Sequence, residues 1–171
     1  METLKKVYQL IGTTALSTSL LLGVSAVENS DQAIAANSES ETTPWYNYDG
    51  YTYNNPSFVL DYDFVEALYA DNVTINGYQT EYDAKTGTGG HSSKVYDTTI
   101  LKDDNGKVGT IMFDVKSGVV TKSEFKKAHE ATMLVDEGDQ YLKYGTLNQH
   151  YLASFDKDGY LVHMEIGVIP Q

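Results

Sequence analysis

A first helix is predicted where apolar residues recur at the spacing of an α-helix. One stripe contains four of them, Phe64, Val65, Leu68 and Tyr69. Either Asp61 or Asp63 can cap the start of this segment, because a carboxylate there accepts hydrogen bonds from free backbone N–H groups. These positions predict a helix from residue 62 to residue 70.

A second helix is predicted by a signature at its start. Thr121 and Glu124 have the spacing of a capping box. Val120 and Phe125 occupy the flanking positions of a hydrophobic staple. We therefore expect a helix that begins at residue 122 and ends at about residue 130.

The other apolar segments are rich in Val, Ile, Tyr and Thr, which favour β-strands. After the first helix they cover residues 73–79, 94–101 and 107–115. After the second helix they cover residues 132–135, 140–144, 149–155 and 160–168. Turns rich in Asp and Gly, at 102–106 and 156–159, predict that the last two strands of each half form a hairpin.

Both halves of the chain thus have the same order of elements: a helix, several strands and an Asp-and-Gly hairpin. The separation of roughly 55 residues indicates a weak internal repeat. We predict an α+β fold in which two short helices pack on one face of an antiparallel sheet. This pattern resembles the tandem helix-plus-sheet modules of bacterial β-lactamase-inhibitory proteins, a likeness of fold alone.

The first 35 residues have the order of a secretory signal peptide. Lys5 and Lys6 precede an apolar run at residues 7–27, and small residues follow it. Cleavage is predicted after Ala35, and cleavage after Ala26 is the alternative. A retained signal anchor is the competing interpretation, because the run approaches the ~20 residues that span a bilayer.

Cleavage after residue 35 would leave a short polar segment and one domain. Residues 36–43 are polar and acidic and are predicted to be flexible. Residues 44–171 are long enough to bury a single core, so we expect one domain. Once the leader has been cleaved, we expect no insertion into a membrane.

Charge and cysteine content narrow the possible functions. The 171-residue chain has 24 acidic and 12 basic residues, a formal net charge of −12, and every basic residue is a lysine. A field of this sign repels polyanions at long range. The absence of cysteine excludes disulfides, thiol catalysis and cysteine metal sites.

One window of the chain is cationic. It contains four lysines and a single acidic residue, Glu124; the lysines are Lys116, Lys122, Lys126 and Lys127. Lys122 and Lys126 share a helix face, and His129 is expected to add positive charge as the pH falls toward about 6.5. The window is either a binding patch or a solvated helix face.

Motifs for catalysis or for metal binding are weak. The loop at residues 85–94 has glycines and lysines but lacks the spacing of a phosphate-binding loop, so we predict a flexible cationic loop. Residues 154–165 partly match a calcium loop, although a hairpin turn explains them more simply. The four histidines have no metal-ligand spacing. We therefore expect no catalytic residues, no metal and no cofactor.

The most distinctive stretch is residues 44–78, PWYNYDGYTYNNPSFVLDYDFVEALYADNVTINGY. It resembles the immunodominant staphylococcal antigen B family, and the likeness continues more loosely through VVTKSEFKKAH and YLVHMEIGVIP. The resemblance implies a non-enzymatic antigen, secreted or at the cell surface, that antibodies recognise. It also implies binding to extracellular DNA and RNA without sequence preference.

Two functional hypotheses follow. In the first, nucleic acid binds through the four lysines and through bases that stack on aromatic residues; the aromatic candidates are Trp45, Tyr46, Tyr48, Tyr51 and Tyr53. The acidic net charge weakens such binding, and these aromatics could instead pack against the edge of the sheet. In the second, the protein is a protein-binding or inhibitor-like module that contacts host or bacterial proteins through its sheet face and exposed tyrosines.

Overall fold

The computed structural model describes residues 43–85 and 90–167. The predicted signal peptide at 1–35, both predicted cleavage positions and nearly all of the flexible segment at 36–43 lie outside the described residues. In the described ranges, no helix has the length and apolar character needed to cross a bilayer.

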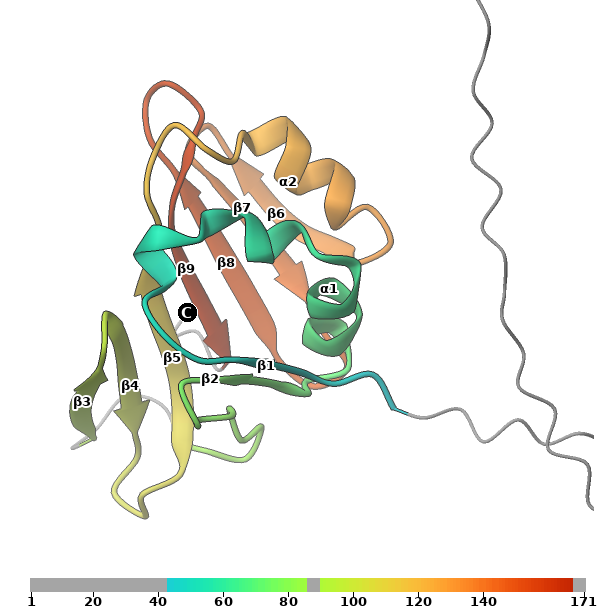
Figure 1. Ribbon diagram of the computed structural model, residues 1–171. Helices are drawn as coiled ribbons and strands as arrows, with labels where there is room; N and C mark the ends of the chain where they lie inside the picture. Colours follow the sequence, from blue (N-terminus) through green and yellow to red (C-terminus); the bar gives the residue numbers. More distant parts are fainter. Residues whose placement is uncertain (1–42, 86–89, 168–171) are drawn as a thin grey trace, which may run out of the picture. The chain divides into compact units, whose positions relative to one another are not determined.

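Most strands of the described chain belong to one antiparallel seven-stranded sheet, shown in Figure 1. Its strands, in spatial order, are β3 (His91–Val95), β4 (Thr98–Lys102), β5 (Val108–Asp114), β9 (Leu161–Gly167), β8 (His150–Phe155), β7 (Tyr141–Gly145) and β6 (Met133–Gly138). The last strand in sequence, β9, is therefore central, and β3 and β6 are the two edges.

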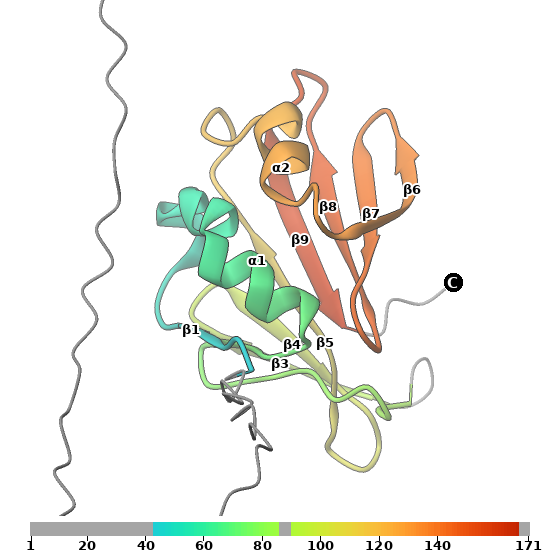
Figure 2. The ribbon, with the colours of Figure 1, turned by 90° about the vertical axis from the view of Figure 1, so that its right-hand side faces the viewer.

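Both predicted helices are present and lie on the same face of this sheet (Figures 1 and 2). Helix α1 spans Tyr62–Tyr69 and α2 spans Lys122–Ala128. The capping box of α2 is formed: Thr121 Oγ1 accepts from Glu124 N at 3.2 Å, and Thr121 N donates to Glu124 Oε2 at 2.9 Å. The predicted α+β class, with two short helices and an antiparallel sheet, is confirmed.

The strands of the two halves of the chain meet in the middle of the sheet. The last strands of the two halves, β5 and β9, pair antiparallel, and this pairing joins the strands of the first half to those of the second. The β4–β5 and β8–β9 hairpins also share one turn geometry. Asp103 Oδ1 accepts from the N–H groups two and four residues ahead, and Asp156 Oδ1 does the same. The two halves thus use one turn at equivalent places.

A second, two-stranded sheet lies beside α1, and the sequence did not predict it. Strand β1 (Tyr46–Tyr48) pairs parallel with β2 (Val73–Ile75). Two 3₁₀ turns, η1 (Thr52–Asn54) and η2 (Pro56–Leu60), lead from β1 to α1. The predicted strand at 73–79 ends early because Asn76 has a positive φ of 52°.

The predicted single strand at 94–101 is wrong, since these residues form a hairpin of β3 and β4. The chain reverses at Tyr96, where φ is 54°. The carboxylate of Asp97 holds this turn by accepting from Thr52 N at 3.0 Å and from Tyr53 N at 2.8 Å. Residues 91–94 of the predicted flexible loop are therefore strand, and residues 86–89 lie outside the described ranges.

The core fills the space between the helices and the sheet. Phe58 and Phe64 pack at one end, with ring centroids 5.1 Å apart, and Phe125 packs against Phe155 at the other, at 5.9 Å. The stripe of α1 includes Ala67, whereas the predicted stripe residue Tyr69 is 42% exposed. Along β8, half-buried and buried side chains alternate. This alternation arises because one face of the sheet packs on the core and the other does not.

Candidate functional site

Two of the four candidate lysines are paired with one carboxylate. Lys126 Nζ lies 2.6 Å from Glu137 Oε2, and Lys122 Nζ lies 3.4 Å from Glu137 Oε1. Lys122 also donates to the carbonyl oxygen of Gly138 at 2.6 Å. The hydrogen bond from Lys126, followed by that from Lys122, holds the pKa of Glu137 below its ordinary value. Phosphates would have to compete with Glu137 for both lysines.

The other two lysines are more available. Lys116 and Lys127 are exposed, and neither forms an ion pair with a residue in the described ranges. Lys116 lies next to Tyr53, because its backbone N–H donates to the Tyr53 carbonyl at 3.2 Å. The lysine window therefore supplies two accessible cations in place of a patch of four.

The expectation that His129 adds positive charge near pH 6.5 is wrong. His129 is fully buried and stacks on Phe125 at 3.9 Å. Its Nε2 lies 3.0 Å from the Val59 carbonyl oxygen, which can only accept, so Nε2 carries the proton and Nδ1 accepts from the Tyr151 hydroxyl at 2.7 Å. Burial lowers the pKa of His129 to about 4.

Tyr46 and Tyr48 pack against core residues of η2 and α1. The ring of Tyr48 stacks on Phe58 at 4.2 Å, and Tyr46 lies edge-on to Phe64 at 5.4 Å. The hydroxyl of Tyr46 donates to Asp61 Oδ2 at 3.1 Å. Desolvation, reinforced by this bond, raises the pKa of Tyr46 to about 12. Both rings are therefore partly covered by the core.

Trp45 stands apart from the other aromatic candidates. It is 71% exposed and lines an open hollow of about 210 Å³ with Tyr62, which is 75% exposed. Asp63 and Glu66 lie in the same hollow. Their carboxylates would repel a phosphate that approached Trp45.

Three exposed tyrosines gather where η1 meets the β3–β4 turn. We call Tyr51, Tyr53 and Tyr96 the tyrosine cluster; they are 56%, 49% and 57% exposed. The rings of Tyr51 and Tyr96 meet edge-on with centroids 5.0 Å apart. The sequence did not point to Tyr96, because the β3–β4 turn is held against η1 by contacts of Asp97 with residues far away in the chain.

The backbone beneath the tyrosine cluster is held at several points. Besides the two bonds to Asp97, the Thr52 hydroxyl donates to the Asp114 carbonyl at 3.1 Å. The amide of Asn76 binds Gly50 through both of its ends, at 2.7 and 3.1 Å. Because these bonds fix the loop before any ligand arrives, binding there costs little ordering entropy.

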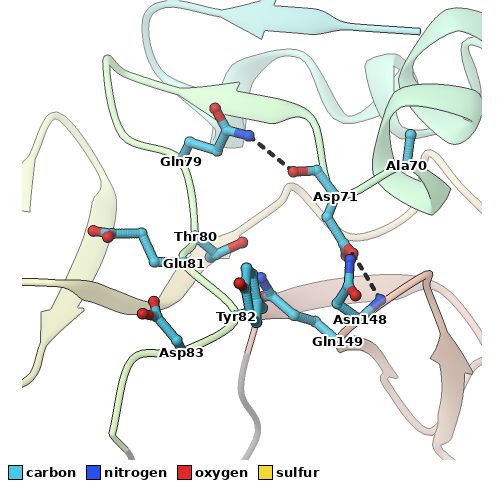
Figure 3. Close-up of a pocket in the computed structure, with 9 residues that line it drawn as sticks. All are labelled: Ala70, Asp71, Gln79, Thr80, Glu81, Tyr82, Asp83, Asn148 and Gln149. Carbon is cyan, nitrogen blue, oxygen red and sulfur yellow. Dashed lines mark hydrogen bonds between the residues drawn. The ribbon is translucent and has the colours of Figure 1, made fainter. Parts of the chain in front are cut away.

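An open pocket of about 550 Å³ lies between the C-terminal end of α1, residues 79–83 and the start of β8 (Figure 3). We call it the acidic pocket; its principal residues are Asp71, Gln79, Glu81, Tyr82, Asp83 and Gln149. It carries three carboxylates and no lysine in its lining. An anionic ligand is therefore unsuited to it, and no sequence motif pointed to the site.

A serine, a histidine and an aspartate meet on the open sheet face without forming a nucleophilic site. His163 Nδ1 donates to Asp114 Oδ1 at 2.7 Å, and Ser154 is its cross-strand neighbour. The second ring nitrogen, Nε2, lies 3.5 Å from Glu165 Oε1. With both nitrogens facing carboxylates, the imidazole is poorly placed to accept a proton from Ser154.

These features define an acidic α+β domain whose described surface includes the tyrosine cluster and the acidic pocket. The sequence pattern of the immunodominant staphylococcal antigen B family matches residues 45–166, and the chain belongs to that family. Relatives named immunodominant staphylococcal antigen B in Staphylococcus aureus strains USA300, NCTC 8325 / PS 47 and COL are 34% identical in alignments 138 residues long, and these alignments cover 75% of this chain and 75% of each relative. No solved structure matches the chain significantly.

Proposed function

We propose that this protein is an exported, non-enzymatic antigen that binds single-stranded nucleic acid weakly and without sequence preference. Membership of the antigen B family supports export, and the resemblance described above implies nucleic-acid binding. The observation that carries the choice of site is the tyrosine cluster, three exposed rings on a backbone that is already held in place. Single strands suit it because their bases are free to stack.

At this site, base stacking should contribute more binding free energy than contact with phosphates. Each base stacked on an aromatic ring contributes about 1–3 kcal/mol, and every base has a face to stack. Phosphate contact contributes less here, because the lysines close to the cluster, Lys116 and Lys94, are opposed by a net charge of −12. For single strands, a plot of the logarithm of the binding constant against the logarithm of the salt concentration has a slope of about −0.7 for each phosphate that the protein neutralises. One or two contacts therefore give a shallow salt dependence.

A fluorescence-anisotropy titration tests this proposal. The probe is a labelled 12-nucleotide single strand, measured at pH 7.5 and at two low salt concentrations. Replacing Tyr51 and Tyr96 together by Ala should weaken binding about 10-fold or more, since each removed stack costs about 1–3 kcal/mol. Replacing Tyr62, which is 75% exposed outside the cluster, by Ala is the matched control.

The outcomes separate the site from the activity. No binding at low salt would refute the function. A different result would move the site to α2: the cluster variant binds normally, whereas a triple variant loses binding. The triple variant combines Lys122→Ala, Lys126→Ala and Lys127→Ala. A duplex of the same sequence should bind more weakly than the single strand, because its bases are already stacked.

A second candidate function is pairing with a partner protein along strand β6. This strand is a sheet edge and exposes three successive apolar side chains: Met133 at 65%, Leu134 at 37% and Val135 at 44%. An edge strand offers unpaired backbone groups to an incoming strand, and the apolar side chains would add contact area. This candidate keeps the non-enzymatic role and changes the partner.

A further inference from the structure

The acidic pocket has unused hydrogen-bond acceptors and few unused donors. Two of the three side-chain amides in its lining are already directed at Asp71: Gln79 Nε2 donates to the Asp71 carbonyl at 2.9 Å, and Asn148 Nδ2 donates to Asp71 Oδ2 at 2.9 Å. The Asp71 carboxylate also accepts from Asn148 N at 2.8 Å and from the Thr146 hydroxyl. Asp71 is thus occupied in holding the 146–148 turn.

The remaining carboxylates face the pocket with capacity to spare. Glu81 accepts from Val108 N through Oε1 at 3.2 Å, which uses one of its two oxygens. Asp83 pairs with Lys107 through Oδ2. Each carboxylate has about four acceptor positions, so both can accept further donors.

Gln149 adds an independent indication that a ligand belongs here. The residue is 6% exposed, and its Oε1 has no hydrogen-bond partner among the described residues. In Figure 3 its side chain extends from the Asn148 side of the pocket toward the Tyr82 side. A buried acceptor without a donor costs free energy, which a bound donor would recover. The terminal torsion of a glutamine is soft, so the oxygen can turn toward a ligand.

We propose that the acidic pocket binds an alkylammonium or guanidinium group, such as the side chain of a lysine or arginine in a basic peptide. Such a group brings several donors, no acceptor and a positive charge, which matches Glu81, Asp83 and Gln149. Tyr82, 69% exposed at the rim, offers its ring face to the cation. The net charge of −12 attracts cations from a distance.

The size and charge of the site argue against other ligands. A volume of about 550 Å³ is within the range of sites that hold a small molecule or a side chain. Phosphates and nucleic acid are repelled by the carboxylates. A neutral sugar would need donors from the protein, and two of the pocket's three side-chain amides are engaged by Asp71.

Calorimetric titration of the full chain with hexalysine tests the proposal, and spermidine is titrated separately. Both carry alkylammonium groups, so spermidine tests a free polyamine and hexalysine tests a peptide. Replacing Glu81 by Gln keeps an oxygen for Val108 N and removes the charge. We expect it to weaken hexalysine binding about 10-fold, because charge-assisted hydrogen bonds are the strong ones. Tyr82→Leu should weaken it about 2- to 5-fold.

The matched control is Glu130→Gln, which removes the same charge from an exposed residue outside the pocket. Equal weakening by Glu81→Gln and Glu130→Gln would mean that net charge alone attracts the peptide and would overturn the proposal. Absence of binding by both probes at low salt would also overturn it. If spermidine binds and hexalysine does not, the pocket takes a free polyamine and the peptide source is excluded.

This site is independent of the proposed nucleic-acid function. Glu81→Gln should leave single-strand binding at the tyrosine cluster unchanged, and Tyr51→Ala with Tyr96→Ala should leave hexalysine binding unchanged. Either activity can therefore fail without the other.

Discussion

Two neighbouring tyrosines in the core make opposite contributions to stability. Tyr144 and Tyr151 are both buried and stack with ring centroids 5.1 Å apart. The hydroxyl of Tyr151 donates to His129, whereas the hydroxyl of Tyr144 has no partner in the described structure. Burial raises the pKa of Tyr144 to about 12, so its hydroxyl stays protonated and unpaired at neutral pH.

We predict opposite effects from one chemical change at these positions. Tyr144→Phe removes an unsatisfied hydroxyl and should raise the free energy of unfolding by about 1 kcal/mol. Tyr151→Phe leaves Nδ1 of His129 buried without a donor and should lower it by about 1–3 kcal/mol. Urea unfolding at pH 7.5 measures both, and effects of the same sign would contradict this account.

Elements with local signals were predictable from the sequence, and elements fixed by distant contacts were not. Helix α2 was predicted because Thr121 and Glu124 stand three residues apart. The β3–β4 hairpin was missed because Asp97 holds its turn through contacts with residues 44 and 45 positions away. The same limit applied to the site: Glu137, which pairs with two candidate lysines, lies on the strand after the helix.

The two edge strands differ in the surfaces that they offer. Strand β3 exposes His91, Ser92, Ser93 and Lys94, which are polar. Strand β6 exposes apolar residues in its first half and Asp136 and Glu137 in its second, and its pairing with β7 is irregular between Leu134 and Asp136. Charges and irregular pairing protect an edge against indiscriminate association, so a partner on β6 would have to match a short apolar segment.

Lysine substitutions on β6 test the second candidate function. Met133→Lys with Val135→Lys should abolish capture of a serum or bacterial surface protein by the immobilised domain. The control, Ser92→Lys with Ser93→Lys, adds the same charge to the other edge. Both variants should unfold within about 0.5 kcal/mol of the parent, as exposed substitutions usually do. Equal capture by both variants would exclude β6 as the contact.

The stability of the whole molecule is linked to pH through His129. The unfolded chain protonates this histidine below about pH 6.5, whereas the folded protein resists protonation until pH falls to about 4. Between these values the unfolded state binds more protons, so the free energy of unfolding falls as pH falls. The groups that face the imidazole, the Tyr151 hydroxyl and the Val59 carbonyl, stay neutral in this range.

Urea unfolding at pH 7.5, 6.0 and 5.0 measures this dependence. Each pH unit below about 6.5 should lower the free energy of unfolding by up to about 1.4 kcal/mol. His129→Gln should flatten the dependence. Carboxylates with lowered pKa values, such as Glu124 and Glu137, add to the loss only nearer their own titration range. A flat profile for the parent protein would refute the assignment.

The central position of β9 has a consequence for the order in which the fold can form. A ribosome makes the chain from its N-terminus, so among the described strands β9 emerges last, yet it joins β5 to β8. Until then, the first three strands and the next three are separate ribbons, each with an unpaired inner edge. The sheet therefore closes only once β9 has been made, and until then the two ribbons stay open and accessible to chaperones.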